Sequence, residues 1–143
     1  MSQRDRITRI VRLKSRIRDA RRGALADAEA HADDARSRVA SADAEVVRLA
    51  EAYCRPGELN ARELAHRASL VASAREGRRR AAERLEEAEA EAARRQAAVA
   101  EASREVRSLE VLDDRLAERE RKDEARREQT ESDERAARMG ATG

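Results

Sequence analysis

Apolar residues recur at alternating steps of three and four along two long stretches of the chain. The first seam consists of Ile7, Ile10, Lys14, Ile17, Arg21, Ala24, Ala28, Ala32, Ala35, Val39, Ala42, Val46, Leu49 and Tyr53. The second consists of Leu64, Ala68, Val71, Arg75, Arg78, Ala82, Leu85, Ala88, Ala92, Arg95, Val99, Ala102, Val106 and Leu109. A 3-4 repeat of apolar positions is typical of helices in a coiled coil. The pattern therefore predicts two long helices.

The two seams match when the chain folds back on itself. In an antiparallel pairing, the numbers of facing residues sum to 116 or 117, so that Val46 meets Val71 and Ile7 meets Leu109. A parallel dimer of straight helices would instead stack Arg75 on its own copy in the seam. We therefore expect an all-α fold, in which two long helices form an antiparallel coiled-coil hairpin.

Capping residues mark where each helix begins. Ser2 is a suitable N-cap with Asp5 three residues later, and Asn60 is followed by Glu63 in the same way. This spacing is that of a capping box, and Leu59 with Leu64 adds a hydrophobic staple.

Helix-breaking residues mark where each helix ends. Pro56 and Gly57 end the first helix, because proline removes a backbone donor and glycine permits a reversal. Gly140 is expected to end the second helix. The prediction is one domain, 1–143, with a helix over 3–53, a turn over 54–60 and a helix over 61–138.

The second helix is longer than the first. At about 1.5 Å per residue, the two helices are roughly 77 Å and 117 Å long. After Leu116 the second helix offers only alanines as apolar residues as far as 138. We therefore expect an overhanging C-terminal helix, which is marginally stable until a partner binds it.

Composition and charge narrow the classes of function. The chain is 43% charged and Tyr53 is its one aromatic residue, so it lacks the large side chains of a compact core. The net charge is only +2, but the charge is unevenly distributed along the chain. Residues 1–23 carry nine basic and two acidic side chains. Such blocks are usually solvated helix faces. Here the basic block also fits docking onto an acidic or anionic surface.

Residues that carry chemistry are few. His31 and His66 fall out of register with each other, Cys54 has no companion, and there is no glycine-rich phosphate loop. We expect no enzyme, metal or cofactor. Without aromatic residues for base stacking, nucleic acid is not expected as a partner. The lack of a signal peptide or membrane span leads us to expect a cytoplasmic protein.

Two stretches resemble a known family. Residues 127–139, REQTESDERAARM, and 48–55, RLAEAYCR, together with the expected hairpin, resemble FliJ and its YscO-type counterparts. These are the stalk proteins of flagellar export and of virulence type III secretion. The resemblance covers nearly the whole chain, but Leu64 and Ala68 stand where the family has bulkier or aromatic residues.

The resemblance implies a stalk that links a hexameric export ATPase to the cytoplasmic domain of the membrane export gate and promotes ATPase assembly or coupling. It implies export chaperones as partners of some members, a location peripheral to the inner membrane, and no membrane insertion. The implied gate contact at the tip is Val46, Leu49, Tyr53, Leu64, Ala68 and Val71. The implied ATPase contact at the termini is Arg6, Arg9, Arg12, Arg16, Glu128, Gln129, Asp133 and Glu134.

Two other classes remain open on the sequence alone. A generic coiled-coil scaffold or chaperone would self-associate, and a nucleic-acid binder would bind DNA or RNA with a steep salt dependence. A stalk is expected to be a monomer, which separates it from the scaffold.

Overall fold

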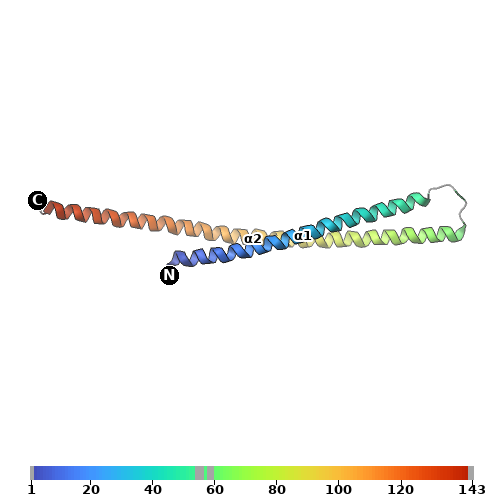
Figure 1. Cartoon of the computed structure of the whole chain (residues 1–143), viewed down its shortest axis with the longest axis horizontal. Helices are drawn as coiled ribbons and strands as arrows, with labels where there is room; N and C mark the ends of the chain where they lie inside the picture. Colours follow the sequence, from blue (N-terminus) through green and yellow to red (C-terminus); the bar gives the residue numbers. More distant parts are fainter. Residues whose placement is uncertain (1, 54–56, 58–59, 142–143) are drawn as a thin grey trace. The chain divides into compact units, whose positions relative to one another are not determined.

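The computed structural model describes residues 2–53, 57 and 60–141. Two helices account for nearly all of them, α1 (Gln3–Tyr53) and α2 (Ala61–Ala141), and the described residues include no strand (Figure 1). The expected turn at 54–60, with Cys54 and Leu59, lies largely outside the described residues. α2 continues three residues past the expected end at 138, because Gly140 has no positive φ and stays helical.

Both helices begin at the predicted caps. The Ser2 hydroxyl accepts a hydrogen bond from the Asp5 backbone N–H at 3.2 Å, and the Asp5 carboxylate accepts one from the Ser2 N–H at 3.1 Å. At α2, the Asn60 side-chain oxygen accepts a bond from the Glu63 N–H at 2.8 Å. These bonds satisfy donors that the first turn of a helix leaves free.

The chain forms two compact units, and both helices pass through both of them. The terminal unit comprises Met1–Asp19 with Ala100–Gly143, and the central unit comprises Ala20–Val99. In each unit a segment of α1 packs on a segment of α2.

The core of the terminal unit is a short row of aliphatic residues. Ile7, Ala102 and Val106 are buried there. Lys14 pairs with Glu105 at 3.0 Å, and Arg4 pairs with Asp113 at 3.3 Å. A later residue of α1 thus contacts an earlier residue of α2, so the two segments are antiparallel.

The core of the central unit is built mainly from small residues. Ala28, Ala32 and Ala35 of α1 are buried, together with Val71 of α2. Alanine lets helices approach closely but buries little apolar area per residue, so each core position contributes modestly. Among the residues that the structure describes, all the buried apolar ones belong to the predicted seams.

Ion pairs and hydrogen bonds also join the two helices of the central unit. Arg36 pairs with Glu89 at 3.5 Å, and Arg78 pairs with Asp43. The Arg21 guanidinium donates to the Ala98 carbonyl at 3.3 Å. The seam residues Arg21 and Arg78 thus fit the interface, because their guanidinium groups bind polar atoms of the other helix and point away from the buried apolar residues.

Two predicted seam residues lie at the edge of the interface instead of inside it. Ile10 and Ile17 keep 43% and 36% of their surface exposed. Val11 and Lys14 are half-buried and occupy the inner positions. α2 therefore covers these two isoleucines only in part, because the packed face of α1 is rotated toward Val11 in this unit.

The residue numbers of the cross-helix pairs test the predicted register, in which facing positions sum to 116 or 117. The partner numbers sum to 117 for Arg4–Asp113 and to 119 for Lys14–Glu105 and Arg21–Ala98. For other cross-helix ion pairs of long side chains they sum to 121, 124 and 125: Arg78–Asp43, Arg4–Glu120 and Arg36–Glu89. Helical side chains tilt toward the N-terminus of their own helix, which raises such sums above those of the facing backbone positions. Sums at or above 117 are therefore consistent with the predicted register.

Candidate docking surfaces

The predicted gate contact lies in the central unit, where α1 ends and α2 begins. Val71 is buried, Val46 and Leu49 are half-buried, and Leu64 and Ala68 are exposed. The side chain of Tyr53 lies outside the part that the structure describes. Of the predicted residues whose side chains are described, Leu64 and Ala68 are therefore the most exposed, and Leu64 keeps 47% of its surface exposed.

A cross-helix hydrogen bond holds the end of α1. The Arg67 guanidinium donates to the backbone carbonyl of Ala52 at 3.1 Å. The last turn of α1 has no basic residue of its own. A cation near the last carbonyls of a helix is favourable, so α2 supplies the charge that α1 lacks.

Apolar residues beside the predicted tip were not predicted from the sequence. Val47 and Leu70 are both exposed, and a shallow groove runs between Ala50, Val71 and Arg75. Val47 and Leu70 lie next to seam positions along the chain. Their position could have been predicted, because an apolar residue directly beside a seam position usually lies outside the helix–helix interface, at or near the surface.

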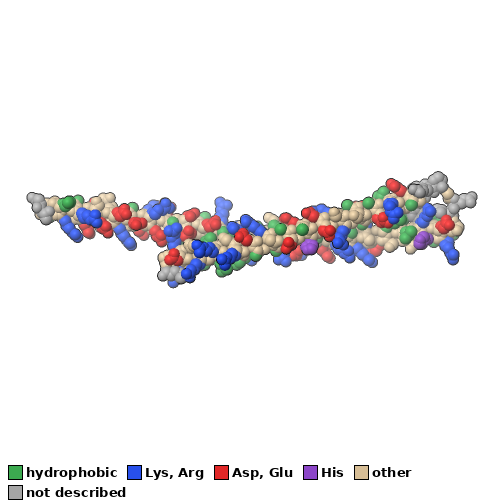
Figure 2. Space-filling view, in the orientation of Figure 1, with side chains coloured by type: hydrophobic (Ala, Val, Ile, Leu, Met, Phe, Trp, Pro, Cys, Tyr) green, Lys and Arg blue, Asp and Glu red, His purple; other side chains and the backbone are tan. Residues whose placement is uncertain are grey.

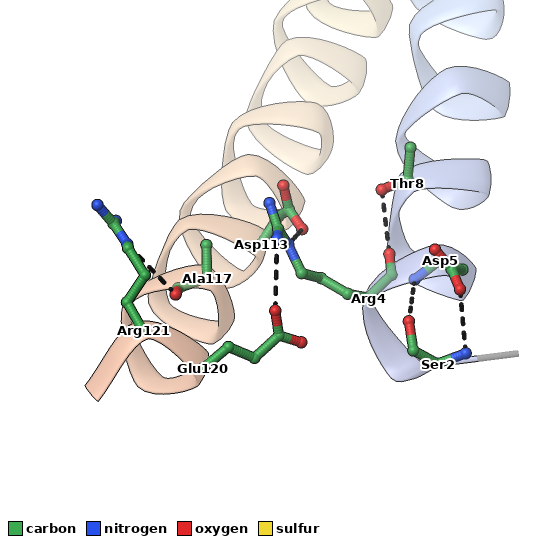
Figure 3. A network of polar contacts seen from close by, with 8 residues as sticks. All are labelled: Ser2, Arg4, Asp5, Thr8, Asp113, Ala117, Glu120 and Arg121. Carbon is green, nitrogen blue, oxygen red and sulfur yellow. Dashed lines mark hydrogen bonds and ion pairs between the residues drawn. The ribbon is translucent and has the colours of Figure 1, made fainter. Parts of the chain in front are cut away.

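A polar network ties the start of α1 to α2 in the terminal unit. Arg4 pairs with Asp113 at 3.3 Å and with Glu120 at 3.4 Å, reaching across from α1 (Figure 3). The hydrogen bond to Asp113 raises the pKa of the Arg4 guanidinium. Arg4, Asp113 and Glu120 were not predicted as functional residues, although Arg4 and Asp113 satisfy the predicted sum.

The predicted ATPase contact consists of exposed residues on two segments of the terminal unit. Its four arginines lie on α1 and its four other residues lie on α2. In the part of the chain that the structure describes, no hydrogen bond or ion pair joins the two groups. Gln129 instead donates to Asp133 at 2.9 Å within α2.

Charged side chains dominate the exposed surface of both helices. Figure 2 shows Lys and Arg side chains gathered over the first turns of α1, and both signs of charge mixed along the C-terminal part of α2. Every described residue of α2 from 118 onward is exposed. This segment, residues 118–141, is held by intrahelical contacts such as Lys122–Glu118 at 3.4 Å.

Local ion pairs lower the pKa of two carboxylates on α2. Hydrogen bonds from Arg79 lower the pKa of Glu76 to about 2. Bonds from Arg94 and then Arg95 lower the pKa of Glu91. These are exposed pairs within one helix, so they stabilise the helix modestly and form no catalytic site.

Side chains that could bind a metal ion are not clustered in the described residues. Among them no group of three or more His, Cys, Asp or Glu side chains is arranged to hold a metal ion. His31 and His66 are both exposed. No described helix is long and apolar enough to cross a membrane. The surfaces found are suited to docking.

Comparison with protein families identifies the family of the chain. A family model described as Flagellar FliJ protein matches residues 3–142, which include the whole of both helices. No curated protein and no solved structure matches the chain. The family match agrees with the resemblance carried by residues 127–139. The chain therefore belongs to the FliJ family, whose members are structural components of flagellar type III protein export.

Proposed function

We propose that this chain is the non-enzymatic central stalk of a flagellar type III export apparatus. It links the hexameric export ATPase to the cytoplasmic domain of the membrane export gate and promotes assembly or coupling of the ATPase. The observation that carries the proposal is the family match over residues 3–142. Two surfaces of different character support it, since a linker must bind two partners.

The terminal unit is the proposed ATPase-binding end. Arg6, Arg9, Arg12 and Arg16 are exposed on α1, and the carboxylate of Asp5 interacts electrostatically with Arg9. We propose that residues 118–141 extend past the start of α1 as an overhang. An exposed helix that carries both signs of charge fits the lining of a pore better than it fits an apolar cleft. Its proposed contacts are Glu128, Gln129, Asp133 and Glu134.

The central unit is the proposed gate-binding end. Leu64 is exposed at the start of α2, and Val47 and Leu70 add exposed apolar surface on both helices. Exposed aliphatic residues grouped on one short part of a helix pair are typical of a protein-binding site. With Val46, Leu49, Tyr53, Ala68 and Val71 they form the proposed contact.

The remaining expectations belong to the same proposal. The whole of 1–143 is one hairpin domain that works as a monomer in the cytoplasm, at the inner-membrane export apparatus. Export chaperones are a further class of partner. The flagellar system is favoured over a virulence system because the matching family model is the flagellar one.

Paired binding assays with purified partners test the proposal. Arg9→Glu, Arg12→Glu and Arg16→Glu combined should abolish binding to the export ATPase and leave binding to the gate domain unchanged. Leu64→Asp should do the reverse. Each variant is the control for the other. If either variant loses both partners while keeping its helicity, the two ends are not separate binding sites.

A mass measurement tests the competing class. Light scattering on the purified chain should give the 16.0 kDa of a monomer. A stable dimer would support a self-associating scaffold and contradict the stalk.

A further inference from the structure

The terminal unit carries an apolar stripe that α2 leaves uncovered. Ile10, Leu13 and Ile17 follow one another at steps of three and four, so they share one face of α1. Leu13 is 57% exposed, and both isoleucines are more than one-third exposed. Three exposed branched residues at this spacing form the half of a coiled-coil interface that still lacks its partner.

A groove runs between this stripe and α2. Ile10 and Leu109 line it, Arg104 and Ser108 form its α2 side, and its volume is about 560 Å³. Leu112, four residues after Ser108, is exposed on the same side of α2. The groove therefore presents aliphatic side chains from both helices, as a third helix packed against a pair requires.

The charges around the groove are mainly basic. On α1 the side chains of Arg6, Arg9 and Arg16 are exposed beside the stripe and make no ion pair among the described residues. On α2 Arg104 lines the groove and Arg115 follows on the same side, also without an ion pair.

Two acidic side chains also lie along the groove. Glu101 lines it, and so does Glu105, whose charge is already paired with Lys14 at 3.0 Å. The basic side chains remain in excess on both sides of the groove. An occupant with acidic side chains on both flanks of an apolar face would match this charge pattern.

We propose that this groove binds an acidic amphipathic helix of another protein, with Leu or Ile on its buried face and Glu or Asp on its flanks. The helix packs on Ile10, Leu13 and Ile17, and its carboxylates pair with the unpaired arginines on either side. Arg6, Arg9 and Arg16 also belong to the proposed ATPase contact. The inference does not rest on the stalk role, because the exposed stripe and the groove support it whichever protein supplies the helix.

A second copy of the chain fits the groove less well. Residues 1–23 carry nine basic and two acidic side chains, so two such faces repel each other. The acidic segment 24–53 has the right sign, but its apolar residues Ala28, Ala32 and Ala35 are already buried in the central unit. The occupant is therefore a different protein.

A synthetic peptide probes the groove without the ATPase or the gate. The probe is a fluorescent helix of about 21 residues with Leu at heptad positions a and d and Glu at e and g. A matched peptide carries Lys at e and g. In anisotropy titrations the full chain should bind the Glu peptide at least about tenfold more tightly than the Lys peptide. Higher salt should weaken that binding.

Neutral substitutions locate the binding site. Leu13→Gln should weaken binding of the Glu peptide by about tenfold, because it removes one aliphatic contact without adding charge. Val47→Gln is the matched control, since Val47 is 54% exposed but lies in the central unit. Circular dichroism should show equal helicity for both variants.

Three results would overturn the inference. Equal binding of the Glu and Lys peptides would remove the charge argument. Unchanged binding by Leu13→Gln would place the peptide elsewhere. A dimer that Leu13→Gln dissociates would show that a second copy occupies the groove.

Discussion

Replacing Val106 by alanine tests whether the terminal unit is held by packing between the helices. Val106 is 1% exposed and is the most fully buried side chain of the described core. Val111, five residues later on the same helix, is 41% exposed and borders a shallow surface formed by residues of α2 alone. Val111→Ala is therefore the matched control, with the same chemical change outside the interface.

The size of the effect follows from the two methyl groups lost. Each buried carbon of this kind contributes about 0.8 kcal/mol, so Val106→Ala should cost about 1.6 kcal/mol in lost burial. Both substitutions gain the same few tenths of a kcal/mol in helix propensity, which cancels between them. We expect the free energy of unfolding of Val106→Ala to lie about 1.6 kcal/mol below that of Val111→Ala.

Urea unfolding followed by circular dichroism at 222 nm measures this difference. The two variants should show similar slopes and a lower midpoint for Val106→Ala. Equal midpoints would mean that Val106 is not covered by α1 in solution. The antiparallel packing of the terminal unit would then be refuted, whatever the helix content of the chain.

Three further predictions concern single features. Asn60→Ala should lower the free energy of unfolding by about 1 kcal/mol, because it removes the cap on the Glu63 N–H; urea unfolding should show this loss and Asn60→Asp should avoid it. Arg75→Leu should leave the thermal midpoint unchanged or raised, since Arg75 is an exposed seam residue beside Val71; a clear fall contradicts the register. Acidification from pH 5 to pH 2 should lower the thermal midpoint. The pKa of Glu76 is lowered to about 2, so its stabilisation is present above its ordinary pKa and is lost as the pH falls through the folded value. Glu76→Gln should reduce this dependence, and a midpoint independent of pH would contradict it.

Most of the fold could be predicted from local pattern. The capping pairs at Ser2 and Asn60 locate the start of each helix because they satisfy backbone donors that any helix start exposes. The 3-4 repeat contains every buried apolar residue of both units, because in a two-helix core only one line of each helix can be covered.

The sequence does not predict which of two adjacent sets of residues on α1 faces α2. At the start of α1, Val11 lies beside the predicted seam and is half-buried, as is the seam residue Lys14, whereas the seam residues Ile10 and Ile17 are exposed although they are the larger apolar side chains. A straight helix drifts about 20° per heptad against its repeat, so small rotations decide which line is covered. The docking surfaces were harder to predict for the same reason, since Leu13 and Val47 lie one position beside the seam.

The stoichiometry of the complex with the export ATPase tests the proposed stalk most directly. A stalk in the pore of a hexameric ring has room for one chain per ring, whereas a protein bound to the outside of each subunit would be present in six copies. The mass of the purified complex, measured by light scattering with ATP analogue present, should exceed that of the ATPase hexamer by one chain of 16.0 kDa. An increase of about six chains, or no complex at all, would contradict the stalk.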